Sequence, residues 1–426
     1  MSLKIRLIAM NFLQFAVWGA YLTSMGRYLG PAGMGGHIGL FYSIQGIVSI
    51  FMPALMGIVA DRWIPAQKLL GICHGIAGAA LIAAGCYGLN TIGSAEFSVL
   101  FSLYTISVAF YMPTLSLSNS VAYSGLEHAG LDIVKDFPPI RVFGTVGFIC
   151  SMWAVDLLGF QDTAMQFVVS GGIGIVLALY AFTLPACPVA RTASTKIVDI
   201  LGLRAFTLFR QRKMAIFFIF SMMLGVSLQI TNGFANPFIA SFEALPEYAS
   251  TFGVQHSNML ISLSQISETL CILLIPFFLK RFGIKNVMLM AMTAWVLRFG
   301  LFGLGDPGSG VWLLILSMIV YGMAFDFFNI SGSLYVDQVT DPAQRSSAQG
   351  LFFLMTNGIG ATIGTLTAQW VVNQFCSWQD VTVGDTTKSL LVGDWSTVWY
   401  IFAAYALVVT ILFAIIFKHN DKKTAQ

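Results

Sequence analysis

One stretch of the sequence is VWLLILSMIVYGMAFDFFNISGSLY, residues 311–335. It is long enough to cross a membrane, and its only charged residue is Asp326, near its middle. Residues 258–278, NMLISLSQISETLCILLIPFF, are interrupted in the same way by Glu268. A carboxylate in the lipid core is energetically costly, and such groups normally face a cavity, a partner or an ion pathway. The two acids therefore indicate a membrane protein with a functional site at membrane depth.

The composition supports this interpretation. The chain of 426 residues is 57% hydrophobic and 10% charged, whereas soluble domains carry about 25% charged residues. Its 41 glycines and 36 phenylalanines fit closely packed membrane helices, in which small residues let backbones approach one another. The net charge of +3 is not gathered into one basic patch, so we expect no nucleic acid polymer as a partner.

Motifs for enzymatic chemistry are missing from the sequence. The six cysteines lack CxxC or histidine spacing, so the sequence predicts neither a disulfide framework nor a metal site, and we expect no cofactor. No GxxxxGK[ST] string supports ATP-driven transport. An intramembrane enzyme is an alternative without a motif, because no HExxH or Ser/His/Asp cluster occurs.

Apolar windows of about 20 residues recur along the chain and predict twelve transmembrane helices in an all-α integral membrane protein. The predicted helices are 6–29, 37–60, 68–90, 95–123, 138–158, 163–184, 213–241, 254–280, 284–304, 310–336, 346–373 and 394–418. We expect two six-helix bundles, residues 1–190 and 213–426, joined by a cytoplasmic central loop at 191–212.

The basic residues predict the orientation. Of the 22 lysines and arginines, all but Arg27, Arg141, Arg298 and Lys388 fall at the termini or in even-numbered connections. The opposite connections carry acidic residues instead. By the positive-inside rule both termini and the central loop are cytoplasmic, and an even number of helices requires the same arrangement.

The connection after the second predicted helix carries a short motif. Residues 57–62, GIVADR, resemble the GxxxDR part of the signature of the major facilitator superfamily, although the later glycine and basic residue of that signature are missing. The resemblance implies the major facilitator fold. In that fold substrates bind between the two bundles near the middle of the membrane.

Polar side chains recur at helical spacing on three predicted helices of the C-terminal half. They are Gln229, Asn232 and Asn236; Ser264, Gln265 and Glu268; and Asp326, Asn329 and Ser333. Aromatic residues such as Tyr321 and Phe325 lie beside them. Amides and a carboxylate beside aromatic faces suit a neutral, polyhydroxylated ligand with a flat ring. A sugar would use the same amides, so a sugar or other small-molecule proton symporter is the nearer alternative.

Long strings closely resemble the bacterial nucleoside permeases, the nucleoside:proton symporter family of the major facilitator superfamily. They include FPPIRVFGTVGF (137–148), FFIFSMMLGVSLQITN (217–232), IPFFLKRFGIKNVM (275–288) and IVYGMAFDFFNISGS (319–333). The resemblance implies proton-coupled nucleoside uptake across the bacterial inner membrane by alternating access, with the substrate between the bundles. The implied partners are purine and pyrimidine nucleosides, protons and the lipid bilayer, and we expect a monomer.

The resemblance also implies site residues. Nucleoside binding in the family is attributed to side chains that match Arg141, Thr145, Phe148, Gln229, Asn232, Gln265, Glu268, Tyr321 and Phe325. Asp326 matches the aspartate that is the family's candidate for proton coupling. Because Gln265 lies one turn from Glu268, we predict that Glu268 binds ribose hydroxyls. We interpret Arg298 as structural or snorkelling and His74 as structural.

Overall fold

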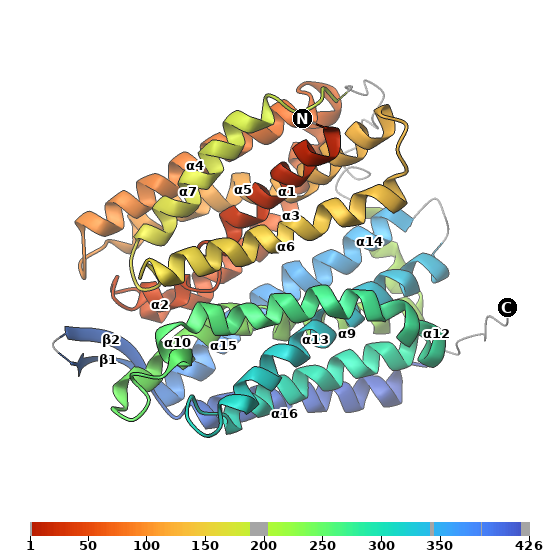
Figure 1. Cartoon of the computed structure of the whole chain (residues 1–426). Coiled ribbons are helices and arrows are strands. Elements are labelled where there is room, and N and C mark those ends of the chain that lie inside the picture. Colours follow the sequence, from red (N-terminus) through yellow and green to blue (C-terminus); the bar gives the residue numbers. More distant parts are fainter. Residues whose placement is uncertain (1, 188–202, 341–344, 385, 419–426) are drawn as a thin grey trace. The chain divides into compact units, whose positions relative to one another are not determined.

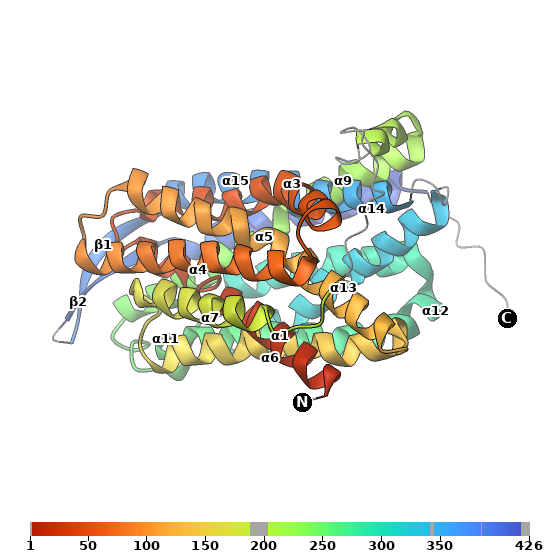
Figure 2. The same ribbon diagram turned by 90° about the horizontal axis from the view of Figure 1, so that it is seen from above.

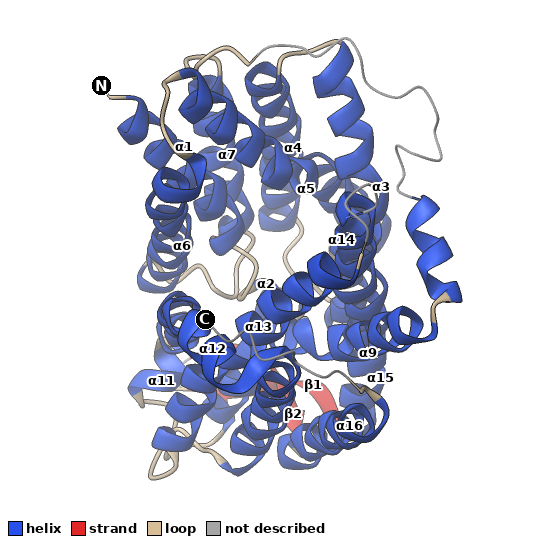
Figure 3. Ribbon diagram, turned by 90° about the vertical axis from the view of Figure 1, so that its right-hand side faces the viewer, coloured by secondary structure: helices blue, strands red, loops and turns tan. Residues whose placement is uncertain are grey.

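The computed structural model describes residues 2–187, 203–340, 345–384 and 386–418. The chain divides into two compact units, residues 1–200 and 201–426. Most of the predicted central loop, 191–212, lies outside the described residues, so the three-part division stays a prediction. The described chain is largely helical, with one pair of short strands (Figure 3).

Unit 1 is built from helices that pack along one another. They are α1 (Leu3–Gly19), α2 (Met25–Leu29), η1 (Gly35–His37), α3 (Ile38–Arg62), α4 (Ala66–Asn90), α5 (Phe97–His128), α6 (Ile133–Leu157) and α7 (Met165–Ala181). Helix α4 packs against α5 and α7, and α1 packs against α6 and α7. Figure 2 shows α4 and α7 running side by side.

Two glycines allow α1 and α6 to touch through their backbones. A Cβ added at Gly147 of α6 would lie 2.1 Å from the carbonyl oxygen of Phe12, and one added at Gly19 of α1 would lie 2.3 Å from that of Phe148. Real Cβ atoms are not found so close to backbone atoms. Small residues therefore set the distance between these two helices, as in many membrane helix pairs.

Unit 2 contains a second set of helices and the strands. They are η2 (Leu203–Arg210), α9 (Arg212–Leu228), α10 (Ile230–Ser241), η3 (Phe242–Ala244), α11 (Phe252–Gln255), α12 (Ser257–Leu304), α13 (Val311–Val339), α14 (Arg345–Phe353), η5 (Leu354–Gly360), α15 (Ala361–Phe375), β1 (Cys376–Val383), β2 (Thr386–Gly393) and α16 (Trp395–Ile416). Helix α12 packs along α13 and α16, and Figure 1 shows this layer.

The predicted all-α membrane fold is confirmed. Nine described helices are long and apolar enough to cross a membrane, and α7 is a shorter apolar helix. The helix α12 covers two predicted spans, because the chain turns at Gly283 with a φ of 77° that favours glycine. Together with α1, the described helices are consistent with twelve crossings. Most of their ends differ from the predicted ones by a few residues, but the first predicted helix, 6–29, is divided, because α1 ends at Gly19 and the short helix α2 begins at Met25.

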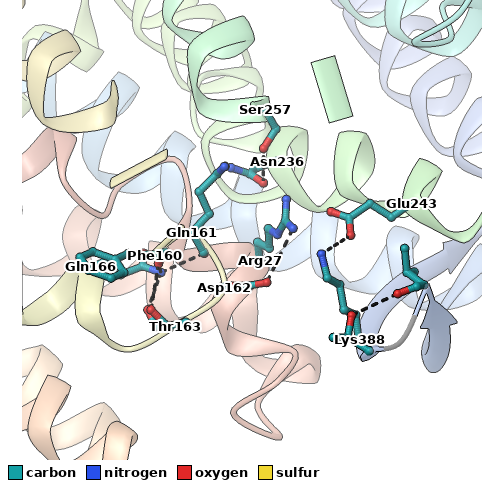
Figure 4. A network of polar contacts seen from close by, with 12 residues as sticks. Arg27, Phe160, Gln161, Asp162, Thr163, Gln166, Asn236, Glu243, Ser257 and Lys388 are labelled. Carbon is teal, nitrogen blue, oxygen red and sulfur yellow. Dashed lines mark hydrogen bonds and ion pairs between the residues drawn. The ribbon is translucent and has the colours of Figure 1, made fainter. Parts of the chain in front are cut away.

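The strands β1 and β2 were not predicted. They form an antiparallel hairpin whose register pairs Cys376 with Gly393 and Val383 with Thr386. Its residues are rich in β-branched valine and threonine, which favour strands, although the helical pattern of the rest of the chain obscured this signal. Lys388 of β2 contacts Glu243 of η3 at 2.7 Å (Figure 4), which ties the hairpin to the end of the α10 segment.

Candidate functional site

The predicted residues of unit 1 lie on one helix, α6. Arg141, Thr145 and Phe148 follow a spacing that places them on one face. Phe148 is buried, and the other two are half-buried. The Arg141 guanidinium carbon lies 3.9 Å from the centre of the Phe15 ring on α1, a cation–π contact that fixes the position of this charge.

A buried polar network joins α1, α4 and α5 and reaches Phe148 of α6 through two aromatic rings. His74 Nε2 lies 2.7 Å from Gln14 Oε1, and Gln14 donates through Nε2 to the Thr114 hydroxyl at 2.7 Å. The Tyr111 hydroxyl donates to the Gln14 carbonyl at 2.9 Å. The Tyr111 ring contacts Trp18, which contacts Phe148 edge-on at 6.4 Å. These contacts agree with a structural role for His74.

In unit 2, Gln229 and Asn232 lie at a break between two helices. Gln229 ends α9 and precedes α10, and its Oε1 accepts a hydrogen bond from Asn232 Nδ2 at 2.8 Å. Interrupted helices are typical of transporter binding sites, because they expose backbone dipoles and polar side chains at membrane depth. Both side chains are half-buried.

The third amide of this predicted face serves packing. Asn236 donates to Asn258 Oδ1 at 2.9 Å and accepts from the Ser257 hydroxyl at 3.0 Å. Figure 4 shows its contact with Ser257 at the start of α12. Asn236 therefore holds α10 to α12.

Unit 1 contains an ion pair of its own. Arg27 Nη2 lies 3.7 Å from Asp162 Oδ2, and Figure 4 shows these two side chains.

Helix α12 carries Gln265 and Glu268, about one turn apart. Gln265 is 9% exposed, and among the described residues no donor reaches its Oε1. A buried acceptor without a donor is costly, by about 1–3 kcal/mol. This atom is therefore suited to accept a hydrogen bond from a bound molecule. Glu268 is half-buried.

Helix α13 brings Tyr321, Phe325 and Asp326 close to Glu268. A Cβ added at Gly322 would lie 2.6 Å from the Ser267 carbonyl oxygen and 2.7 Å from the Glu268 nitrogen. The two helices thus touch backbone to backbone at the level of both acids. Tyr321 and Phe325 stack with ring centres 5.7 Å apart, and Asp326 is 6% exposed.

The structure agrees with one of the two interpretations of Arg298 made from the sequence. The residue is 2% exposed, so its side chain does not snorkel to the membrane surface, and the structural role stands. It donates to the Ser317 carbonyl at 2.9 Å, and its guanidinium carbon lies 4.4 Å from the centre of the Tyr321 ring. The helical pattern alone gave no sign of this contact, because it joins two different helices.

The predicted site residues therefore lie in three places. Three lie on α6 in unit 1, and in unit 2 Gln229 and Asn232 lie at the break between α9 and α10. The packing of α12 against α13 brings the other five into one region of unit 2. In the part of the chain that was searched, no cluster of His, Cys, Asp or Glu could hold a metal ion. Helical units with paired amides and acids at membrane depth are the architecture of a secondary transporter.

The comparisons with known proteins specify this class. A family model described as "Nucleoside H+ symporter" matches residues 1–422. The chain belongs to this family, and it is therefore a nucleoside:proton symporter and not an enzyme.

Individual relatives agree with the family. The chain is 48% identical over 424 residues to the nucleoside permease NupG of Escherichia coli, covering 99% of this chain and 97% of the relative. It is 47% identical to the xanthosine permease of the same species, with the same coverage. A crystal structure of a mutant of the nucleoside transporter NupG superimposes with a TM-score of 0.89, at 47% identity and 98% and 100% coverage. The predicted major facilitator fold is thus confirmed.

Proposed function

We propose that this symporter takes up purine and pyrimidine nucleosides with protons across the bacterial inner membrane by alternating access. It works as a monomer with both termini in the cytoplasm. Membership of the nucleoside H+ symporter family supports the substrate and the coupling ion. The distribution of basic residues supports the orientation.

The nucleoside is bound by side chains of both halves of the chain. The proposed set is Arg141, Thr145 and Phe148 of α6, Gln229 and Asn232 at the α9–α10 break, Gln265 and Glu268 of α12, and Tyr321 and Phe325 of α13. Aromatic rings stack on the base. Amide and carboxylate oxygens accept hydrogen bonds from ribose hydroxyls, and amide NH2 groups donate to the base.

The observation that carries this assignment is the environment of Gln265 and Glu268. The Gln265 Oε1 atom is a buried acceptor without a donor in the described chain, and Glu268 presents two more acceptor oxygens about one turn away. A ribose offers neighbouring hydroxyl donors, so one bound sugar can donate hydrogen bonds to both side chains. Ligand binding then removes the cost of the unsatisfied acceptor.

Asp326 is the proposed proton site. Burial favours its neutral, protonated form, and access to water with a nearby cation favours the ionised form. Protonation from the outside lets the nucleoside bind without a bare buried charge, and release of the proton inside completes the cycle. One proton supplies about 2.3 kcal/mol per 100 mV and about 1.4 kcal/mol per pH unit, enough to concentrate a nucleoside roughly a hundredfold.

The test is uptake of radiolabelled uridine and adenosine into proteoliposomes with the purified chain. We expect accumulation when the outside is acidic, and its loss on addition of a protonophore. Unlabelled nucleosides should compete for uptake, whereas xylose should not. Accumulation that ignores the protonophore would contradict coupling, and competition by xylose would support the sugar symporter instead.

A further inference from the structure

Arg298 is a deeply buried basic side chain of unit 2. It is 2% exposed and lies on the part of α12 that follows Gly283. Nη1 donates to the Ser317 carbonyl at 2.9 Å and lies 3.4 Å from the Ser264 hydroxyl. The Ser317 hydroxyl donates back to the Arg298 carbonyl at 2.8 Å. These bonds fix the side chain between α12 and α13.

No carboxylate contacts this guanidinium among the described residues. Its ring contacts are Tyr321 at 4.4 Å and Phe302 at 5.1 Å, and its Nε has no acceptor in the same part of the chain. A buried charge without a counterion is strongly destabilising, and a cation–π contact recovers about 2 kcal/mol. The charge therefore requires negative charge elsewhere in the unit.

Tyr321 links Arg298 to the acids through its place on α13. Its ring is held by the cation and by the edge-on ring of Trp295, 5.9 Å away. Gly322, the next residue, lies against the backbone of Ser267 and Glu268, and Asp326 follows about one turn further along the same helix. The Tyr321 ring thus contacts the fixed cation where α13 meets the backbone at Glu268.

The other elements around Arg298 add no competing charge in the described chain. Phe299 and Phe302, beside it on α12, pack against Trp399 of α16, and Phe302 packs against Phe238 of α10. The titratable groups near the acids are Tyr321 and the Cys271 thiol, which follows Glu268 by about one turn on α12. Glu268 and Asp326 are therefore the acids that can balance Arg298.

We propose that Arg298 is the fixed countercharge of the acid pair Glu268 and Asp326, and that it fixes the Tyr321 ring beside the contact of α13 with Glu268. This inference rests on the proposed function, in which Asp326 exchanges the proton. With Asp326 protonated and Glu268 ionised, the three groups sum to zero charge. When both acids are ionised, the sum is −1. Arg298 therefore makes the singly protonated acid pair the neutral, stable state of unit 2, which is the state proposed to bind nucleoside.

The test compares Arg298→Gln with Arg298→Lys. Loss of the positive charge disfavours ionised acids, so the pH midpoint of uridine binding should rise by about one unit in Arg298→Gln, which corresponds to about 1.4 kcal/mol. Arg298→Lys keeps the charge and should keep the midpoint. It should raise the KM severalfold with little change in kcat, because an ammonium lacks the planar fork that holds Ser317 and Tyr321. Binding is measured by ligand-induced thermal stabilisation of purified protein between pH 5 and pH 9.

The matched control is Arg212→Gln, which removes an exposed arginine from the first turn of α9. It should leave the midpoint unchanged. A wild-type midpoint in Arg298→Gln would overturn the proposal, and so would an equal shift in Arg298→Lys.

A double variant decides the matter if Arg298→Gln does not fold. Charge balance predicts a higher melting temperature for the double variant Arg298→Gln with Glu268→Gln than for Arg298→Gln alone. A purely structural role of Arg298 predicts that the second substitution does not raise the melting temperature. The melting temperature is measured on purified protein and does not depend on transport activity. Rescue of stability in the double variant, together with a wild-type chain that fails to accumulate nucleosides, would therefore contradict the proposed function and leave the countercharge standing.

Discussion

The two units each place an arginine against an aromatic ring, yet the surroundings of the two arginines differ. In unit 1, Arg141 lies over Phe15 at 3.9 Å and is half-buried. In unit 2, Arg298 lies over Tyr321 at 4.4 Å and is 2% exposed. The candidate site of unit 1 contains no acid among Arg141, Thr145 and Phe148, whereas unit 2 contributes Glu268 and Asp326.

The two units therefore contribute different electrostatic properties to the proposed function. Unit 1 supplies a fixed positive charge and an aromatic face, neither of which changes between pH 5 and pH 9. Unit 2 supplies the carboxylates, whose charge can change, together with an internal cation to balance them. Proton coupling should therefore be lost through changes in unit 2, and changes in unit 1 should affect binding and packing. Four further experiments test or refine this comparison.

The largest effect is expected from Asp326→Asn. Asparagine cannot exchange a proton, so accumulation driven by a pH gradient of about two units should fall roughly a hundredfold, because one proton supplies about a factor of ten per pH unit. Exchange of labelled for unlabelled uridine at equal pH should persist, because it needs no net proton movement. Asp380→Asn on the exposed part of β1 is the control, and pH-driven accumulation by Asp326→Asn would refute the assignment.

A smaller loss is expected from Glu268→Ala. Removal of a charged acceptor that binds two hydroxyls should weaken uridine affinity about 10- to 100-fold, because hydrogen bonds to charged groups contribute about 1.5–3 kcal/mol. Glu268→Gln keeps one acceptor and should lose less. Isothermal titration calorimetry with uridine measures both, and wild-type affinity in Glu268→Ala would exclude the ribose contact.

The glycine contacts of the two units should be comparably sensitive. Gly147→Ala in unit 1 and Gly322→Ala in unit 2 each force a methyl group into a neighbouring backbone, at a cost of about 1–3 kcal/mol. The controls are Gly172→Ala of α7 and Gly300→Ala of α12, where an added Cβ meets nothing within 4 Å. Heat denaturation should show lower melting temperatures for the first pair only.

Only Gly322→Ala of the first pair should also shift the pH dependence of uridine binding. The reason is that Gly322 sets the distance between the two helices that carry Asp326 and Glu268, whereas Gly147 lies on a helix whose candidate site residues include no acid. Equal pH profiles for the two variants would argue against assigning proton coupling to unit 2 alone.

The smallest effect concerns the start of α16. The Asp394 side chain accepts hydrogen bonds from the Thr397 hydroxyl at 2.6 Å and the Thr397 backbone N–H at 3.0 Å, and both bonds hold the pKa of Asp394 below its usual range. A lowered pKa adds stability above the ordinary value near 4, and this stability is lost as the pH falls through the lowered value. Asp394→Ala should lower the melting temperature on the order of one degree at pH 7. The difference from wild type should narrow between pH 5 and pH 3, and a constant difference would contradict the cap.

The sequence predicted the elements better than their contacts. Hydropathy located the crossings to within a few residues, because the lipid core requires a long apolar segment wherever a helix spans it. It did not predict the β1–β2 hairpin, because the strand signal there is short and lies beyond the apolar windows. It also suggested one polar face for Gln229, Asn232 and Asn236, although Asn236 holds α10 to α12.

The sequence by itself determined that the chain is a membrane protein, that its helices are many and apolar, and that two acids lie at membrane depth. These conclusions depend on local composition, and burial in lipid makes a charged residue stand out. Only the tertiary structure decided that Gly322 brings the helix of Asp326 against the backbone at Glu268, and that Arg298 faces Tyr321. Such contacts join helices that are distant in the sequence, and they depend on the rotation and spacing that close packing imposes on each pair.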